Sequence, residues 1–408
     1  MMFLVIVLSI LFAIDSYSLW KWSRFVKRSE LPAYFYKSAW VVSILMLISI
    51  AFYASMRYYN PLFASEIGIL HNITSVWYVP KLLLFPFFVI IDLFKLIKKG
   101  LVYLNQPQQH EKIKMMKKEN ADNSRRKFAR NVGLTISSVP FIIVSKGSFD
   151  SVTDPRVHKA EIPIKDLPDA FEGLKIAQIS DVHTGSFRSA KMFREVVQIV
   201  NDHKPDIFVN TGDFVNFNPE ELALFQDEWK KFKPDIGVYS CLGNHDHYMT
   251  DTEHITLVNY LNDLDQNLLM NENQVIERRG KRLVIAGIDN LGMGQDYGDI
   301  DKALNGINTN DPVIFLCHDP TNWDSRIRNQ RKVDLMLSGH THGGQFGFTI
   351  RGKQYSPASF KYNQWAGLYR DKDQHLYINR GLGTSGFPVR IGMNPEITIL
   401  TLRKSNAV

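Results

Sequence analysis

The chain has 408 residues, and its formal net charge of +7 at pH 7 is unevenly distributed. Positions 1–130 hold 18 Lys and Arg against 7 Asp and Glu, whereas positions 131–408 hold 30 against 34. The slightly acidic second part argues against a large nucleic-acid footprint, which requires clustered basic side chains. The two cysteines, Cys241 and Cys317, exclude a disulfide-rich framework.

The segment 1–100 is predicted to form a helical transmembrane region. Residues 38–56 contain no charged side chain, and a run of this length is long enough to cross a bilayer. Residues 1–14 and 73–94 are further candidates, and Trp and Tyr gather near the predicted ends, as in aromatic belts. Asp15 and Asp92 are expected at interfacial ends of these spans. Buried helices of a soluble domain are the alternative, but the region lacks their amphipathic period.

The distribution of Lys and Arg predicts the orientation of these spans. Residues 21–37 hold five basic side chains and residues 95–130 hold eleven, whereas residues 57–75 hold only Arg57. Because cytoplasmic loops carry an excess of Lys and Arg, the first and third of these loops are predicted to be cytoplasmic. The N-terminus is then outside, and residues 101–130 form a basic cytoplasmic segment.

A fourth crossing is predicted at residues 131–145, a charge-free run that follows Arg125 and Arg126. The arginine pair, Phe128 and the apolar run together resemble a twin-arginine export signal. If this run crosses the bilayer, the rest of the chain lies on the extracytoplasmic side, which is the expected location. The alternative is a short helix or an interfacial anchor, since the run is short for a full span, and it would leave the second part of the chain in the cytoplasm.

Beyond a linker predicted at residues 146–173, strands and helices alternate, which is typical of an α/β domain. Short apolar runs predict buried strands, and helical periodicity predicts the intervening helices. The predicted strands are residues 175–179, 206–210, 237–242, 313–317, 333–337, 375–379 and 396–402, the predicted helices are residues 189–203, 227–233 and 251–264, and residues 275–288 are a predicted hairpin.

Five short polar segments each follow one of these apolar strands. In chain order they are Asp181-Val182-His183, Gly212-Asp213, Gly243-Asn244-His245-Asp246, His318-Asp319 and Gly339-His340-Thr341-His342. Carboxylate, imidazole and amide groups are metal-ligand types, and α/β sheets carry their chemistry at the carboxyl ends of parallel strands. The pattern therefore predicts a metal centre at this edge of the sheet.

The order of the five segments resembles the calcineurin-like metallophosphoesterase superfamily over residues 174–402. The resemblance is strongest to a bacterial membrane-associated subgroup, which also has a G-L-G-T-S-x-x-P-x-R element, here residues 381–390. It implies an αββα sandwich, which we expect over residues 174–408, preceded by the helical transmembrane region.

The resemblance also implies two divalent cations, with Mn, Fe, Zn and Ni all compatible with the mixed nitrogen and oxygen ligands. Two such ions neutralise phosphate charge and activate a water molecule for attack. The implied ligands are Asp181, His183 and His342 at one ion, Asn244, His318 and His340 at the other, and Asp213 as the bridge.

Three further assignments concern residues that are not implied ligands. The resemblance implies that His245 protonates the leaving oxygen, and we expect Asp246 to orient it. Arg390 is expected either to contact a substrate phosphate or to form a structural ion pair. The aromatic loop at residues 349–368 is expected to line an apolar pocket, to face the bilayer or to pack within the fold.

We therefore interpret the sequence as a membrane-anchored, binuclear metal-dependent phosphoesterase. Its expected substrate is a phosphomonoester, a phosphodiester or a pyrophosphate, and the membrane region favours a lipid-linked or envelope compound. One alternative is a hydrolase of cyclic nucleotides or other soluble phosphodiesters. An alternative of another class is a membrane scaffold or receptor with little turnover.

Overall fold

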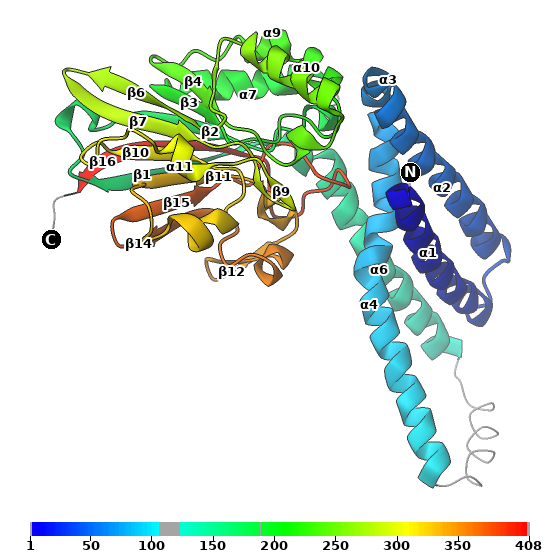
Figure 1. The fold of residues 1–408 in the computed structure, drawn as a ribbon. Helices are drawn as coiled ribbons and strands as arrows, with labels where there is room; N and C mark the ends of the chain where they lie inside the picture. Colours follow the sequence, from blue (N-terminus) through cyan, green and yellow to red (C-terminus); the bar gives the residue numbers. More distant parts are fainter. Residues whose placement is uncertain (1, 106–122, 188, 406–408) are drawn as a thin grey trace. The chain divides into compact units, whose positions relative to one another are not determined.

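The computed structural model describes residues 2–105, 123–187 and 189–405. The chain divides into two compact units (Figure 1). The first comprises Met1–Ser55 and Ile69–Lys146, and the second comprises Met56–Gly68 and Gly147–Val408. The short segment Met56–Gly68 thus belongs with the second part of the chain, although both of its sequence neighbours belong to the first unit.

The first unit is built from long helices. They are α1 (Met2–Arg28), α2 (Tyr34–Tyr59), α4 (Gly68–Asn105) and α6 (Asn123–Phe149). In the described part of the chain, three stretches are long and apolar enough to cross a membrane, namely Leu4–Arg28, Tyr34–Arg57 and Asn131–Thr153. The predicted span at residues 73–94 lies within α4, which is not among these three. Within the predicted basic segment, residues 106–122 lie outside the described residues.

Helix α6 is longer than the crossing predicted at residues 131–145. It has 27 residues, and at a rise of about 1.5 Å per residue it extends roughly 40 Å, more than the thickness of a bilayer core. The helix continues through Pro140 and through the basic residues that precede the apolar run. The candidate span Asn131–Thr153 has 23 residues, so length does not count against a fourth crossing.

One acidic residue of the helical unit lies elsewhere than expected. Asp15, expected at an interfacial end, is buried within α1. Its carboxylate pairs with Lys81 of α4 and accepts hydrogen bonds from Ser43 and, at 3.3 Å, from Nε1 of Trp77. A charged side chain tolerates burial among apolar helices when a counter-charge and polar donors surround it, and Lys81 provides the counter-charge.

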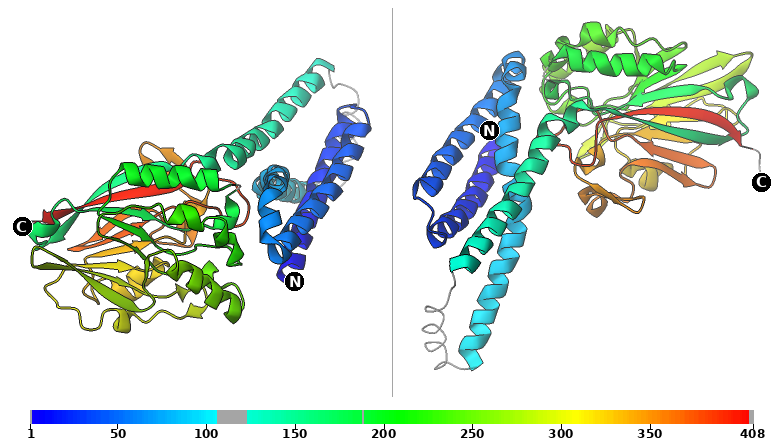
Figure 2. Two further views of the ribbon diagram at one scale, coloured as in Figure 1. Left: turned by 90° about the horizontal axis from the view of Figure 1, so that it is seen from above. Right: turned by 180° about the vertical axis from the view of Figure 1, so that it is seen from behind.

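The second unit contains two stacked six-stranded sheets (Figure 2). One has the order β1-β16-β2-β3-β4-β5 and the other β14-β15-β11-β10-β7-β6. Their bounds are β1 (Arg156–Lys165), β2 (Lys175–Ile179), β3 (Ile207–Asn210), β4 (Gly237–Ser240), β5 (Asn267–Leu268), β6 (Glu272–Arg278), β7 (Lys281–Gly287), β10 (Val313–Leu316), β11 (Leu335–Ser338), β14 (Gly367–Asp371), β15 (Gln374–Ile378) and β16 (Glu396–Ser405). Strands β2 to β5 run parallel, as do β7, β10, β11 and β15.

Three apolar layers hold this unit together. The central layer lies between the sheets and includes Ile207 and Ile314, one from each sheet. Helices α7 (Ala190–Asp202) and α10 (Asp251–Asn262) cover the first sheet, and α11 (Ile300–Ala303) with the π-helical turn η5 (Trp323–Ile327) covers the second. The arrangement confirms the predicted α/β class and the αββα sandwich.

The segment predicted as a linker, residues 146–173, instead contributes a strand. Strand β1 pairs in parallel with β16 from Arg156↔Glu396 to Lys165↔Ser405. Ile162 and Ile164 point into the central layer, which stabilises the strand, and Pro163 between them is tolerated because β1 is at the sheet edge. The prolines that suggested a linker are thus compatible with an edge strand.

Candidate metal centre

The five polar segments of the sequence meet where the parallel strands of both sheets end. The first three follow β2, β3 and β4 of one sheet, and the last two follow β10 and β11 of the other. Because parallel strands end at the same edge, the stacked sheets bring all five loops together.

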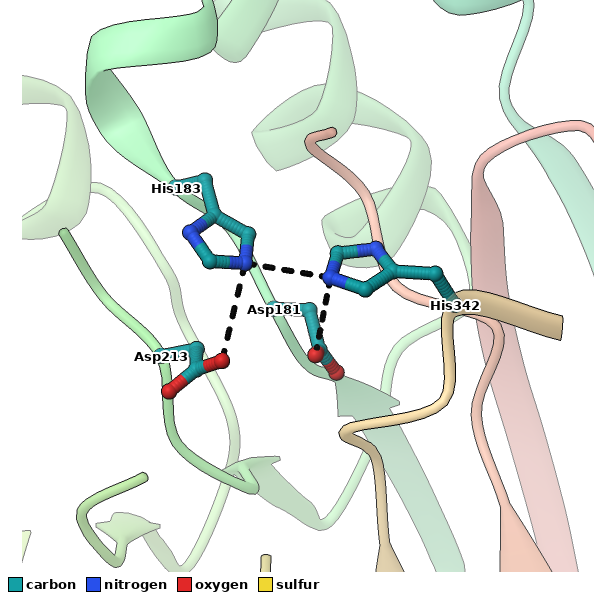
Figure 3. Close-up of side chains that lie close together, drawn as sticks. All are labelled: Asp181, His183, Asp213 and His342. Carbon is teal, nitrogen blue, oxygen red and sulfur yellow. Dashed lines mark hydrogen bonds and ion pairs between the residues drawn. The ribbon is translucent and has the colours of Figure 1, made fainter. Parts of the chain in front are cut away.

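Four of the predicted ligands form one buried cluster (Figure 3). One potential ligand atom from each of Asp181, His183, Asp213 and His342 lies within 4.8 Å of the others. Nε2 of His183 lies 3.1 Å from Nε2 of His342, and Nε2 of His342 lies 3.3 Å from Oδ1 of Asp181. The four side chains point toward one another, an arrangement with the donor set of a divalent cation site.

A second group lies on the other side of Asp213. Nε2 of His318 lies 3.2 Å from Oδ2 of Asp213, and Nδ1 of His340 lies 3.3 Å from Nε2 of His318. The same Oδ2 atom lies 3.5 Å from Nε2 of His183. One carboxylate oxygen is therefore shared between the two groups of histidines.

Asn244 and His183 have buried polar atoms that the protein itself does not satisfy. Within the described ranges, Oδ1 of Asn244 and Nδ1 of His183 have no hydrogen-bond partner. The Asn244 amide nitrogen donates to the hydroxyl of Tyr248 at 3.0 Å, which leaves the carbonyl oxygen available as a ligand. An unsatisfied buried carbonyl oxygen is costly, and a cation would remove this cost. The residues present thus fit a divalent-cation site.

The backbone around these side chains is strained. Five of the seven predicted ligands have positive φ, with values of 48° for Asp181, 44° for His183, 56° for Asp213, 71° for His340 and 51° for His342. Residues other than glycine rarely adopt such angles, and they persist at sites where the surrounding structure imposes them. The sharp turns let side chains that are adjacent in sequence reach different groups.

Gly339 illustrates how closely the loops approach one another. A Cβ atom at this position would clash with Oγ of Ser180 and with Oδ2 of Asp181. The backbone nitrogen of His340 then donates to both carboxylate oxygens of Asp181, at 3.0 and 2.9 Å. Glycine is required here because the two loops are in direct contact.

Burial and charge set opposite protonation states within the centre. Burial alone would raise the pKa of Asp213, but the charges of His318 and His245 outweigh it and hold this pKa well below its usual range. Burial opposes the charge on His318 as well, yet the Asp213 carboxylate raises the His318 pKa to about 10. Burial also raises the pKa of Asp181 to about 6. Asp213 is thus the carboxylate most strongly kept ionised in the centre.

The remaining histidines of the centre favour the neutral form. Burial lowers the pKa of His340 to about 4, and it holds the pKa values of His183 and His342 well below their usual range. Neutral imidazole is the form that binds a metal ion. These three side chains therefore need not release a proton to become ligands at neutral pH.

The structure changes the role expected for Asp246. Its buried carboxylate accepts from the backbone nitrogens of Asp213 and Gly243, both at 2.9 Å, and from that of Phe214 at 2.8 Å. The His245 ring is held instead by the carbonyl of Asn216, which lies 2.9 Å from Nδ1. The expectation that Asp246 orients His245 directly is wrong, because the loop turns the carboxylate toward backbone amides.

The His245 loop is supported by a set of residues that no sequence motif marks. The Oε2 atom of Glu221 accepts from the backbone nitrogens of Gly185 and Asn216, at 3.2 and 2.7 Å, and from the Asn216 amide at 2.8 Å. Its other oxygen lies 3.6 Å from Nη2 of Arg57. Helix α3 (Pro61–Glu66), in the same segment as Arg57, contacts η3 (Thr184–Ser186) directly after His183. No spacing in the sequence links Arg57 to this site.

Arg390 was expected to contact a substrate phosphate or to form a structural ion pair, and the structure shows a third arrangement. It is fully buried, and its guanidinium donates to the carbonyls of Gly383, Met393 and Arg380. Nη2 also lies 3.3 Å from Nδ1 of His342. These contacts favour a structural role behind His342, because no donor of Arg390 faces solvent where a substrate could bind.

Comparison with known proteins identifies the family. Residues 174–344 match the family model described as calcineurin-like phosphoesterase, and residues 1–151 match the model described as probable calcineurin-like phosphoesterase, transmembrane domain. The uncharacterized metallophosphoesterase YkuE of Bacillus subtilis is 31% identical over 246 residues, which cover 59% of this chain and 82% of YkuE. The chain belongs to the calcineurin-like metallophosphoesterase family.

Three further members of the family differ in how much of their length matches. An uncharacterized metallophosphoesterase of Campylobacter jejuni is 26% identical over 416 residues and covers 99% of both chains. The zebrafish transmembrane protein with metallophosphoesterase domain is 31% identical over 277 residues, which cover 65% of this chain and 61% of that protein. The match to the bovine counterpart covers 64% of its length. The chain thus spans less than two thirds of the length of these vertebrate relatives. The two family models together show that this chain is a membrane protein in which a transmembrane region precedes a metallophosphoesterase domain.

Proposed function

We propose that this chain hydrolyses phosphoesters with two divalent cations held between the loops of its two sheets. The observation that carries the proposal is the position of Asp213, whose Oδ2 atom lies 3.5 Å from one histidine cluster and 3.2 Å from the other. A shared, ionised carboxylate is the group that a two-metal site requires.

The proposed ligand sets follow the two clusters. Asp181, His183 and His342 would hold one cation, Asn244, His318 and His340 would hold the other, and Asp213 would be a ligand of both. When bound, the cations neutralise charge on the phosphoryl group and lower the pKa of a water molecule. The mixed nitrogen and oxygen donors accept Mn, Fe, Zn or Ni.

We assign the leaving-group proton to His245. Its Nδ1 atom lies 2.9 Å from the carbonyl of Asn216, which sets the ring orientation and directs Nε2 away from that loop. The ring lies edge-on to that of His183, with a distance of 4.7 Å between centroids. A positioned imidazole beside the clusters can donate a proton to an oxygen that leaves from the phosphorus.

The substrate class supported by the family and the site is a phosphomonoester, a phosphodiester or a pyrophosphate. The transmembrane region supports a substrate held at the membrane, such as a lipid-linked or envelope phosphoester. A soluble phosphodiester such as a cyclic nucleotide is the second candidate, and a scaffold with little turnover is the third.

Metal removal tests the proposed reaction. The purified full-length chain with added Mn²⁺ is expected to hydrolyse bis-p-nitrophenyl phosphate, and a chelator is expected to abolish release of p-nitrophenolate. Readdition of Mn²⁺ should restore it, since folding of the sandwich rests on its apolar layers rather than on the cations. A metal-loaded, folded chain without turnover on mono- and diester substrates would support the scaffold instead.

We propose that the catalytic residues lie on the extracytoplasmic side. The segment Met56–Gly68 belongs to the same compact unit as the metal centre and begins in the last turn of α2, which supports a position of both at the membrane side where α2 ends. Residues 57–75 hold one basic side chain, whereas residues 21–37 hold five, which supports an outside position for this segment. Crossings by α1, α2, α4 and α6 are consistent with that position.

Reporter fusions test this topology. Alkaline phosphatase joined after Val408 is expected to be active, because the enzyme functions only outside the cytoplasm. A fluorescent protein joined there is expected to be dark if the chain is exported unfolded, and fluorescent if it uses the twin-arginine route, which exports folded proteins. The matched control joins the same reporters after Gln108, where the opposite pattern is expected. An inactive phosphatase together with a fluorescent fusion at Val408 would assign the domain to the cytoplasm.

A further inference from the structure

The hairpin β12 (Phe348–Ile350) and β13 (Lys353–Tyr355), with the 3₁₀ turn η7 (Pro357–Phe360), carries an unusual density of exposed apolar side chains. Phe360 is 94% exposed and Phe348 is 59% exposed, and Ile350 and Tyr355 are exposed as well. We call residues 348–360 the aromatic hairpin. Large apolar groups gathered on one surface indicate a binding surface rather than ordinary surface composition.

The exposed groups of the two strands share one face of the aromatic hairpin. Phe348 pairs with Tyr355 across the strands, and their rings stack with centroids 5.4 Å apart. Ile350 pairs with Lys353 on the same face, since side chains alternate along a strand. The opposite face carries Gln354, whose Oε1 accepts from Arg380 at 2.8 Å. The polar face thus holds the hairpin on the domain and leaves the apolar face outward.

The charged side chains in the sequence around the hairpin have one sign. Residues 335–370 contain no aspartate or glutamate, and they contain four basic side chains. Of these, Arg351, Lys353 and Lys361 are exposed on or directly after the hairpin. Exposed aromatic rings beside lysines and arginines match the interface of an anionic bilayer, where rings enter the headgroup region and basic groups meet phosphates.

The aromatic hairpin is also joined to the metal centre. Oγ of Ser356 donates to the carbonyl of Gly343, which follows His342, at 2.7 Å. Just beyond the hairpin, the hydroxyl of Tyr362 lies 3.1 Å from Nε2 of His340. The segment therefore contacts the loop that carries the last two predicted ligands at two points.

We propose that the aromatic hairpin docks on the anionic lipid surface of the membrane that anchors the chain. The occupant is the lipid rather than a second protein, because the helical region keeps the domain next to a bilayer and the surface combines apolar rings with positive charge. Docking would hold the loop that carries His340 at the headgroup level. In that position the site can reach a phosphoester carried by a lipid, and this last step rests on the proposed function.

Site-specific labelling tests the docking without any activity assay. Cys241 and Cys317 are both buried, so Phe360→Cys provides a selectively labelled thiol in the full-length chain. The matched control is Ile255→Cys on α10, another exposed apolar position, at 60% exposure. Both carry an NBD fluorophore and are placed in nanodiscs of phosphatidylcholine and phosphatidylglycerol, which leave both faces of the bilayer accessible.

The label at position 360 is expected to be quenched by nitroxide-bearing lipid and protected from iodide, and the label at position 255 is expected to show the reverse. Replacing phosphatidylglycerol by phosphatidylcholine should weaken the lipid quenching at position 360. Iodide quenching equal to that at position 255 would overturn the proposal. Protection from iodide without lipid quenching would also overturn it, because protein would then cover the hairpin.

A second measurement separates docking from catalysis. The double variant Phe348→Ser with Phe360→Ser is expected to hydrolyse bis-p-nitrophenyl phosphate at the normal rate, since neither side chain touches the metal centre. Its turnover of a phosphoester carried by a nanodisc lipid should fall by about tenfold or more, because the free energy gained by burying one phenylalanine side chain corresponds to a factor of about this size. Equal turnover of the lipid by variant and parent would overturn the docking. A parent without soluble turnover would instead refute the proposed function, and the labelling result would stand.

Discussion

Asp213→Asn is expected to abolish phosphoester hydrolysis and to lower metal content at both positions. The amide keeps the shape of the side chain but removes the charge that lies between His183 and His318. Substitutions that only support a ligand cost about 10–100-fold, so loss of the bridging ligand should exceed ~10²-fold. Turnover of bis-p-nitrophenyl phosphate and metal analysis of the dialysed protein measure the two effects.

The matched control for this substitution is Asp227→Asn, which makes the same chemical change at an exposed position of α9 (Gln226–Trp229). It should retain both metal content and turnover. Thermal unfolding of the chelated proteins shows whether the Asp213 variant folds. A folded Asp213→Asn chain with full metal content and near-normal turnover would remove Asp213 from the bridging role.

His245→Ala is expected to leave the metals bound and to lower kcat by ~10²–10⁴-fold, the usual contribution of a positioned acid. The loss should be large for an alkyl phosphoester, whose leaving oxygen needs a proton. It should be small for a p-nitrophenyl ester, whose leaving group departs as a stable anion. The comparison of the two substrates therefore measures proton donation rather than general damage to the site.

The control histidine is His203, the C-terminal cap of α7, which holds its own helix carbonyl at Ile199. His203→Ala should leave turnover of both substrates unchanged. If His245→Ala slows the alkyl and the p-nitrophenyl ester by the same factor, the acid role of His245 is refuted. Lost metal in that variant would point to a ligand role instead.

Local sequence patterns predicted many of the strands and helices of the αββα sandwich. The strand predicted at residues 175–179 agrees with β2, and the helix predicted at residues 189–203 agrees with α7 to within one residue at each end. Both elements repeat their apolar side chains at the period of the structure they form. Strand β1 was not predicted, because the prolines of this segment are typical of a linker. Its pairing at the sheet edge also depends on β16, which lies at the far end of the domain sequence.

The sequence by itself determined which side chains are available as ligands and that they follow parallel strands. Residue type and strand periodicity are local properties, so Asp213 and His318 were named without a structure. Only the tertiary structure decided that one oxygen of Asp213 lies between two histidine clusters and that Asn216, not Asp246, holds His245. The Arg57–Glu221 pair was likewise decided by the tertiary structure, because it joins groups that are far apart in the sequence. Such contacts follow from how the sheets stack and how the loops turn, which no short stretch of sequence specifies.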